Sequence, residues 1–507
     1  MKITRTWHCL LWVGLAVLIH FFPGSAHSQP AASCSPSTGV TAAAGPQACL
    51  TTLVETFTNS KIFQFDGLEL AAAEADDAAF ESLLKGCVAT ASCKGAQLNL
   101  YNRLLELEEN ASQLLGFGPT TFSLNLSAQG VADALRWTAD EEFAAQSSIT
   151  SRFAGNQFSA VSNRLTALRF LQAVRLARQD GETGNGLLAD LTSDGSVAWG
   201  GGASGDPESS SQFGRWSVFA NSSYGAGTKA PTVFDDAFSF GGTQVSLGAD
   251  VRLSSHAVVG LLINHVNQEA DFNSSESVVG GGITSSGYGV TSYLQLDWDA
   301  AYLNFSLGGQ RVSLDSTRLV AYPSNNPLVP SVDTTFQSST YANSLLLTTG
   351  GGYLLHSRGF SAEPYLNLQY LYTRIDAFTE TASSTDNTGF ATSVSSQGVT
   401  SLQGILGLKL QYVWQPKFAV ILPYVYGEYR HEFRNPSQDV SSQFGAAPAG
   451  NYFQLPTDAL NASFYQVGAG LSAVLPHGAQ LYFQYMRVLS LQYYTDWVAS
   501  GGFRFEF

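Results

Sequence analysis

The fold of the C-terminal part is decided by the stretch YQVGAGLSAVL, residues 465–475. Its odd-numbered positions are apolar, from Tyr465 to Leu475, and the positions between them are mostly small or polar. Successive side chains of a β-strand point to opposite faces, so the stretch predicts a strand with one apolar face and one polar face. The same two-residue period recurs at residues 301–307 and 406–414.

An apolar face of this kind fits either the interior of a soluble β-sandwich or the lipid-facing wall of a membrane barrel. The lengths of the connections distinguish the two. Short turns alternate with long polar segments, as in outer-membrane barrels with their short periplasmic turns and long outer loops, and a sandwich gives no reason for this alternation. We expect the turns near residues 254–255, 297–299, 357–359, 415–417 and 476–478, and the loops at 224–242, 269–286, 320–337, 379–397 and 434–458.

The segments with strand character predict an all-β, 12-stranded antiparallel transmembrane β-barrel over residues 215–507. The even number of strands places both ends of the barrel on the periplasmic side. The expected strands are residues 215–224, 243–253, 256–268, 287–298, 300–319, 341–356, 360–378, 399–414, 417–433, 460–475, 479–491 and 496–507.

The composition excludes other classes of protein. Hydrophobic residues make up 44% of the 507 residues, enough to build a large core, so the chain is not disordered. The net charge of -15 disfavours binding to nucleic acid. After the first 28 residues no apolar run approaches the length of a membrane-spanning helix, which excludes a helical membrane protein.

The N-terminus predicts export from the cytoplasm. Lys2 and Arg5 precede an apolar run at residues 9–22, and small residues at 26 and 28 fit a signal-peptidase site. We therefore expect residues 1–28 to be a cleaved signal peptide. A retained membrane anchor and a lipoprotein are the less favoured alternatives.

Residues 29–180 are predicted to be mainly α-helical. Apolar residues recur three and four positions apart, for example at Phe158, Val161 and Leu165. We expect helices near residues 68–85, 98–115 and 128–146, and a further helix that ends at Gln179. The acidic residues are expected on solvated helix faces; they are Glu106, Glu108, Glu109, Asp140, Glu141 and Glu142.

Residues 181–214 are rich in Gly and Ser and are expected to form a linker that precedes the barrel. Four of the five cysteines follow the signal peptide, and all four lie in the first 100 residues. In an oxidising periplasm they can form two disulfides. We favour pairing of neighbours, Cys34 with Cys49 and Cys87 with Cys93, although three connectivities are possible. A zinc site is disfavoured because no His lies near, and no metal or cofactor is expected.

The predicted helix before the linker carries arginines in an otherwise acidic chain: Arg164, Arg169, Arg175 and Arg178. The lumen of a closed barrel has a polar wall that needs partners. We expect this helix, or the segment just after it, to lie in the lumen or at its periplasmic mouth and to pair with inward carboxylates. An exposed helix outside the barrel is the alternative.

The last predicted strand carries the most specific signal. Trp497, Phe503, Phe505 and Phe507 share one face, and Phe507 ends the sequence. Alternating aromatic residues that end in Phe resemble the signal by which outer-membrane barrels are recognised by their assembly machinery.

Residues 215–507 as a whole resemble the C-terminal translocator domain of autotransporters, the type V secretion family. The resemblance implies a barrel in the outer membrane, a helix that threads its pore, and an upstream passenger that is displayed or released. Here the passenger is short and helical, and lacks the repeats of a β-helix. The resemblance rests on residues 214–216, 248–253, 363–365, 375–380, 430–433 and 503–507, and upstream on 134–137, 141–146 and 164–169.

Three functions remain open from the sequence. The first is an autotransporter that anchors or exports its helical region for adhesion or another surface interaction. The second is a pore or structural barrel whose helical region is periplasmic or plugs the lumen, and the third is an outer-membrane hydrolase. Catalysis is not expected, because the N-terminal third lacks both a GxSxG motif and a His after the signal peptide. His431 and Glu432 are adjacent on a strand and so point to opposite faces.

The expected partners follow from the predicted location. They are outer-membrane lipid, the barrel-assembly machinery and the secretory translocon. The sequence identifies no surface ligand.

Overall fold

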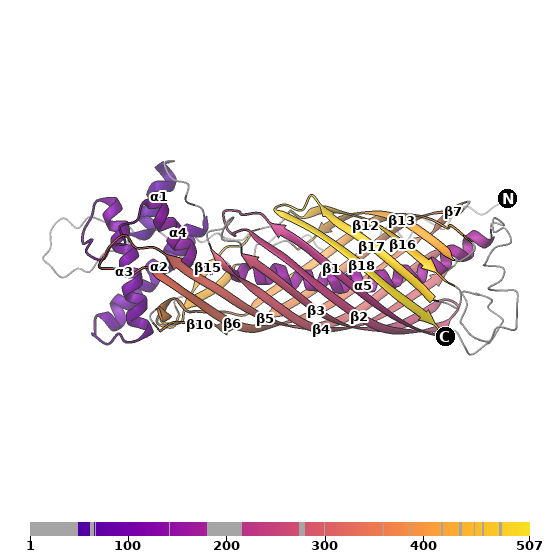
Figure 1. The fold of residues 1–507 in the computed structure, drawn as a ribbon, viewed down its shortest axis with the longest axis horizontal. Coiled ribbons are helices and arrows are strands. Elements are labelled where there is room, and N and C mark those ends of the chain that lie inside the picture. Colours follow the sequence, from indigo (N-terminus) through magenta and orange to yellow (C-terminus); the bar gives the residue numbers. More distant parts are fainter. Residues whose placement is uncertain are drawn as a thin grey trace, which may run out of the picture.

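The computed structural model describes residues 49–60, 65, 67–140, 142–179, 215–272, 279–298, 300–357, 359–385, 387–416, 419–434, 439–450, 452–458, 461–475 and 479–507. The expected signal peptide, Cys34 and the expected linker at residues 181–214 lie outside these residues. A long barrel occupies most of the molecule, and a group of helices lies at one end of it (Figure 1).

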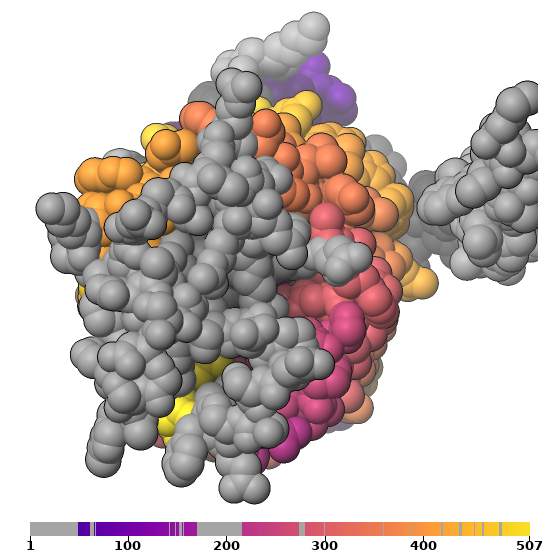
Figure 2. Space-filling view, turned by 90° about the vertical axis from the view of Figure 1, so that its right-hand side faces the viewer, coloured from indigo at the N-terminus to yellow at the C-terminus, as the bar shows by residue number. Residues whose placement is uncertain are grey.

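The structure confirms the predicted closed, 12-stranded antiparallel barrel. The first strand pairs with the last, with Ser217 opposite Glu506, so the ring has no open edge. In the end view of Figure 2 the yellow end of the chain lies beside the magenta start of the barrel. The barrel strands are β1 (Trp216–Lys229), β2 (Phe238–Ser254), β3 (Ala257–Phe272), β4 (Gly280–Trp298), β5 (Ala301–Tyr322), β6 (Val332–Tyr353), β8 (Phe360–Ile375), β12 (Gln397–Tyr412), β13 (Val420–Glu432), β16 (Ser463–Val474), β17 (Ala479–Leu489) and β18 (Tyr494–Glu506).

The apolar faces of the strands point outward. On β5, Phe305 and Leu307 are exposed on the outside, whereas Asn304 and Ser306 between them are buried on the inside. Lipid tails cannot hydrogen-bond to the backbone, so strands cross a membrane stably only as a closed ring with an apolar outer surface. The described part of the chain holds no helix with both the length and the hydrophobicity to cross a membrane.

The strands extend further toward the long loops than expected. The expected loop at residues 224–242 shrinks to 230–237, because β1 and β2 stay paired up to Lys229 and Phe238. Outside the membrane both faces of a strand can be polar, so the two-residue period fades while the backbone pairing continues. Short strands also form within the loops: β9 (Phe378–Thr379), β10 (Thr381–Ala382), β11 (Thr392–Val394), β14 (Val440–Phe444) and β15 (Phe453–Leu455), while β7 (Leu355–Ser357) lies at the opposite, short-turn end.

Among the described residues five α-helices precede the barrel: α1 (Leu50–Ser60), α2 (Gly67–Leu83), α3 (Ala96–Leu115), α4 (Ala128–Thr138) and α5 (Glu142–Gln179). A π-helical turn, η1 (Leu84–Val88), extends α2, and a 3-10 turn, η2 (Thr388–Phe390), lies in a barrel loop. The helix expected at residues 128–146 is two helices, because Ala139 takes an extended backbone conformation. We call α1–α4 the cap, since they lie at the long-loop end of the barrel (Figure 1).

The cap and the barrel share one hydrophobic core. Leu100, Leu104 and Leu107 of α3 belong to the same buried cluster as Phe336 and Phe390 of the barrel and its loops. Hydrogen bonds join the two parts as well: the backbone N–H of Asn325 donates to the Leu124 carbonyl (2.8 Å), the Asn326 amide to Ser123 O (2.7 Å), and Arg103 to Pro330 O (3.1 Å).

The expectation that the acidic residues lie on solvated helix faces is wrong. Glu106, Glu108, Glu109, Asp140 and Glu142 are all buried, and Glu141 lies outside the described residues. The cap packs onto the barrel and onto itself, which takes these faces out of water. Backbone donors and arginines serve as partners instead: Cys49 N–H donates to Glu108 (2.5 Å), Phe122 N–H to Glu109 (2.5 Å), Arg103 pairs with Glu106 (3.0 Å), and Arg318 with Asp140 (3.5 Å).

Cap stability is predicted to fall as the pH rises. Burial raises the pKa of Glu106 to about 7, although Arg103 opposes the shift, and burial also raises the pKa of Asp76 and of Glu108. In the unfolded chain a Glu ionises near pH 4.3, so unfolding between that pH and about 7 releases a proton, and stability is lost across this window. We expect the cap helices, followed by circular dichroism, to melt roughly 5 °C lower at pH 8 than at pH 5.

The variant Glu106→Gln removes one of these titrating groups and is expected to flatten the pH dependence. Glu81→Gln is the matched control, because the Glu81 side chain is 44% exposed and its ion-pair partner among the described residues is Lys85, four positions along the chain. A melting temperature that rises with pH, or an equal flattening by both variants, contradicts the prediction.

Candidate functional site: the helix in the lumen

Helix α5 runs through the inside of the barrel from the cap to the short-turn end (Figure 1). With 38 residues it is about 57 Å long, which exceeds the hydrocarbon thickness of a bilayer. Gln157, Arg164 and Arg169 are buried, although each is polar or charged. The surrounding strands therefore have to supply their partners.

One side of α5 packs tightly against β1, β3 and β4. Val161, Leu165 and Leu168 form a buried cluster with Phe219, Leu262 and other inward residues of these strands. Apolar residues on the inner wall are unusual for a water-filled pore, whose lumen is polar. Here they match the apolar stripe of the helix, so this half of the lumen is dry.

Arg164 lies at the centre of the first charged cluster. Its Nε donates to Asp250 Oδ2 (2.6 Å) and a terminal nitrogen donates to Ser217 Oγ (2.9 Å). Tyr293 donates its hydroxyl to the same carboxylate oxygen (2.7 Å), and the guanidinium lies 4.8 Å from the ring centroid of Phe219. The buried carboxylate and the buried guanidinium thus satisfy one another, which ties α5 to β1, β2 and β4.

Arg169 forms the second cluster, close to the short-turn end. Its Nε lies 2.8 Å from Glu363 Oε1, and Lys409 Nζ lies 2.7 Å from the other oxygen of that carboxylate. Tyr302 donates to Glu363 (2.7 Å), and its ring lies under the guanidinium at 4.4 Å. One buried carboxylate of β8 therefore joins α5 to β5 and β12.

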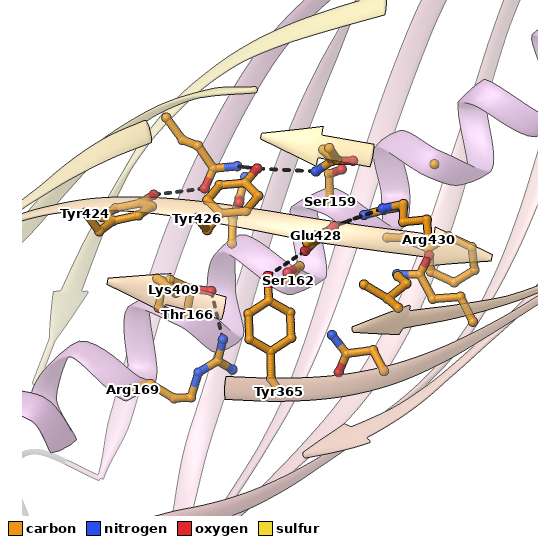
Figure 3. A pocket seen from close by; sticks show the side chains of 18 residues that line it. Ser159, Ser162, Thr166, Arg169, Tyr365, Lys409, Tyr424, Tyr426, Glu428 and Arg430 are labelled. Atoms are coloured by element: carbon orange, nitrogen blue, oxygen red, sulfur yellow. Dashed lines mark hydrogen bonds and ion pairs between the residues drawn. The ribbon is translucent and has the colours of Figure 1, made fainter. Parts of the chain in front are cut away.

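The other side of α5 faces a polar cavity of about 60 Å³, shown in Figure 3. Four of the helix residues that line it are small, Gly155, Ser159, Ser162 and Thr166, and they lie beside the larger Phe158, Asn163 and Arg169. The wall bonds to itself: Tyr365 and Arg430 both donate to Glu428 (2.7 and 2.9 Å), and Tyr424 donates to Gln484 (2.8 Å). A polar space of this volume has room for about four to six waters.

An apolar collar packs against one side of α5 at the cap end of the lumen. Ala145 and Ile149 of the helix form a buried cluster with inward residues of β2 to β6 and β8. Water and ions have no polar partners in such a cluster. This side of the lumen is therefore apolar at the cap end; the barrel members of the collar are Phe238, Phe240, Val266, Ala270, Phe272, Ile283, Val312, Leu314, Ala342 and Ile375.

The other residues singled out from the sequence occupy separate places. Arg175 and Arg178 lie in α5, but their side chains are outside the described set. Phe503, Phe505 and Phe507 are exposed on the outer wall of the barrel.

The cysteines and histidines form no common site. Cys87 and Cys93 are joined by a disulfide, and Cys49 is buried at the start of α1. His431 bonds to Ser463 and Glu432 to Ser401, so these neighbours have different partners. Within the described residues no three His, Cys, Asp or Glu side chains gather in a way that suits a metal ion.

The partners of the lumen helix were not identified from the sequence. Asp250 and Glu363 both stand in stretches that resemble the family, but no role followed for either. Each is a carboxylate on the inward face of its strand and is nearly fully buried. A carboxylate that falls on the same alternate positions as the small and polar residues of a strand is predicted to face the lumen, and this pattern could have identified both residues.

The Arg164–Asp250 pair is predicted to hold α5 in place. Removing one partner leaves the other charge buried, which costs about 3–5 kcal/mol. Arg164→Met and Asp250→Leu, each alone, are therefore expected to speed hydrogen exchange of the α5 amides strongly, and the double variant less than the sum of the two. Ser162→Ala on the cavity side is the matched control and should leave exchange nearly unchanged. Strictly additive effects of the two substitutions would show that the pair does not act as a unit.

Comparison with known proteins agrees with this geometry. The sequence profile of the Autotransporter beta-domain family matches residues 218–486. No curated protein matches the chain.

Several solved structures are similar to this chain. The translocator domain of autotransporter NalP from Neisseria meningitidis is 15% identical, with a TM-score of 0.45 over 58% of this chain and 89% of that one. The beta domain of the Bordetella autotransporter BrkA is 17% identical, with a TM-score of 0.39 over 58% of this chain and 100% of that one. The transport unit of the autotransporter AIDA-I from Escherichia coli is 14% identical, with a TM-score of 0.40 over 60% of this chain and 93% of that one.

The family profile spans more than half of the 507 residues and coincides with the barrel. The chain therefore belongs to the autotransporter family, and its barrel lies in the outer membrane with a helical N-terminal region attached.

Proposed function

We propose that this autotransporter displays its own cap on the cell surface and keeps it there. The observation that carries the proposal is the core that the cap shares with the long-loop ends of the strands. A passenger built for release would need a surface of its own that is stable in water. This cap instead completes its core with residues of the barrel.

The orientation follows from the connections. Short turns join β2 to β3 and β4 to β5, at the end where the C-terminus lies (Figure 1). The long connections, with their short extra strands, lie at the other end, next to the cap. Outer-membrane barrels place short turns in the periplasm and long loops outside, so the cap faces the exterior.

Retention has a physical cause in the buried contacts. Release of the cap would expose Phe336, Phe390 and Phe444, which are almost completely buried. It would also leave Arg318 without Asp140, although Glu380 would still pair with it at 2.6 Å. Burial of a single Phe contributes about 1.5–3 kcal/mol, so the cap stays attached even if its link to α5 is cut.

The proposed role of the displayed cap is adhesion or another surface interaction rather than catalysis. The filled lumen supports an anchor in preference to an open pore, which is the second candidate. The exposed Phe503, Phe505 and Phe507 support recognition by the barrel-assembly machinery, after export through the secretory translocon.

Labelling of single cysteines on intact cells tests the orientation. Ala78 is exposed on α2 of the cap, and Ser255 is exposed in the short turn between β2 and β3. We expect a membrane-impermeant maleimide to label Ala78→Cys on intact cells, because the cap is outside. Ser255→Cys should be labelled only after the outer membrane is permeabilised.

The unsubstituted protein gives the background from its native cysteines. Labelling of Ser255→Cys but not of Ala78→Cys on intact cells would mean that the cap is periplasmic. Full recovery of the cap in the culture medium, with the barrel left behind, would contradict retention while leaving the orientation intact.

A further inference from the structure

A row of polar side chains crosses the outer wall of the barrel on five neighbouring strands. His265 pairs with Tyr288, Tyr288 with Arg311, Arg311 with Asn343, and Asn343 with Arg374. All five are exposed on the outside. Neighbouring strands lie about 4.8 Å apart, so the row is about 20 Å long. We call it the cationic row, after its two arginines.

The cationic row lies at the edge of the apolar, lipid-facing wall of the barrel. On the β4 strand, Tyr288 and Trp298 are ten residues apart and both exposed, which corresponds to about 25 Å across the membrane for a tilted strand. That is the height of the apolar band of an outer-membrane barrel. Toward the turns, the next large outward residue on each of the five strands is apolar or aromatic: Ile263, Val290, Leu307, Leu345 and Tyr372. Toward the loops, the next outward residues are mostly polar: Asn267, Ser286, Ser313, Tyr341 and Asp376.

The two arginines of the row keep their donors available. Among the described residues neither Arg311 nor Arg374 makes an ion pair or a side-chain hydrogen bond, in contrast to Arg164 and Arg318 inside. The Arg311 guanidinium lies 4.4 Å from the ring centroid of Tyr341, which orients it. His265 donates through Nδ1 to the Gly287 carbonyl (3.0 Å). Asp376 is two residues closer to the loops than Arg374, and the row itself contains two arginines and no carboxylate.

An apolar groove of about 580 Å³ lies on the same strands, on the membrane side of the row. It opens because Ser292 and Thr349 are small among larger outward residues. Leu307, at one edge of the groove, is four residues from Arg311, or about 13 Å along the strand. The larger residues that line it are Val259, Leu294, Phe305, Leu307, Leu347, Leu368 and Tyr370.

We propose that the outer wall over β3 to β8 binds one lipid with a phosphate-bearing headgroup. The acyl chain lies in the groove, and Arg311 and Arg374 hold the phosphate in the leaflet on the cap side. Arginine matches phosphate oxygens with paired N–H donors, and such contacts are strong where water is scarce. Lipid supplies both the acyl chain for the groove and the anion for the row, whereas a free phosphate ion would leave the groove unused.

Binding of phosphatidic acid to the full-length protein in detergent micelles tests the proposal, with diacylglycerol of the same chains as the neutral comparison. Native mass spectrometry reports the bound lipid. We expect at least tenfold weaker binding for the double variant Arg311→Gln with Arg374→Gln, and for diacylglycerol. Arg487→Gln is the matched control, because Arg487 is also outward and unpaired in the described structure but lies between Val467 and Trp497 on β17. It should change binding less than twofold.

Ser292→Phe gives an independent test, since it fills the groove and leaves both arginines in place; we expect it to weaken binding at least fivefold. Heat-dependent migration on gels shows that each variant is folded, and Ser292→Phe decides the question if the double variant is not. Equal binding of diacylglycerol, an equal loss with Arg487→Gln, or no effect of Ser292→Phe would overturn the proposal. Competition by inorganic phosphate at equal concentration would assign the row to free anions and overturn the lipid site.

Discussion

The whole structure depends on hydrogen bonding of the backbone within hydrocarbon. No water is available there, so the strands must form a closed ring, and the pairing of β1 with β18 completes it. Closure has a second consequence. It creates an inner wall that carries Asp250, Glu363 and Lys409, and these charges need partners in a space with little water. Arg164 and Arg169 of helix α5 pair with Asp250 and Glu363, and Lys409 pairs with Glu363 as well.

The two sides of the lumen helix match the two kinds of inner wall that they face. Its apolar stripe meets apolar residues of β1, β3 and β4, and its small polar residues border the polar cavity on the opposite side. At the cap end, the apolar collar packs against Ala145 and Ile149. The helix thus fills the lumen and links the barrel to the cap, so the cap keeps a fixed position on the barrel.

The barrel could be predicted because its signals are local. The alternation at residues 465–475 and the contrast between short turns and long loops need no knowledge of distant contacts. The partners of the lumen helix could not be assigned, because Arg164 and Asp250 are 86 residues apart and strand register alone does not say which carboxylate faces which arginine. The cap's docking was missed for the same reason: Asn326 and Ser123, 203 residues apart, meet only after folding. The acidic helix faces were misjudged because burial, unlike helicity, depends on what packs against the helix.

Ion conductance across a planar bilayer tests most directly whether α5 closes the barrel. The mature chain and a barrel that begins at residue 215 would be compared, with heat-dependent gel migration to show that both are folded. The account predicts that the mature chain is electrically silent, whereas the barrel without the helix and cap opens a stable, ohmic pore. Equal steady conductance of the two proteins would show that the lumen is not filled by the helix and would contradict the account.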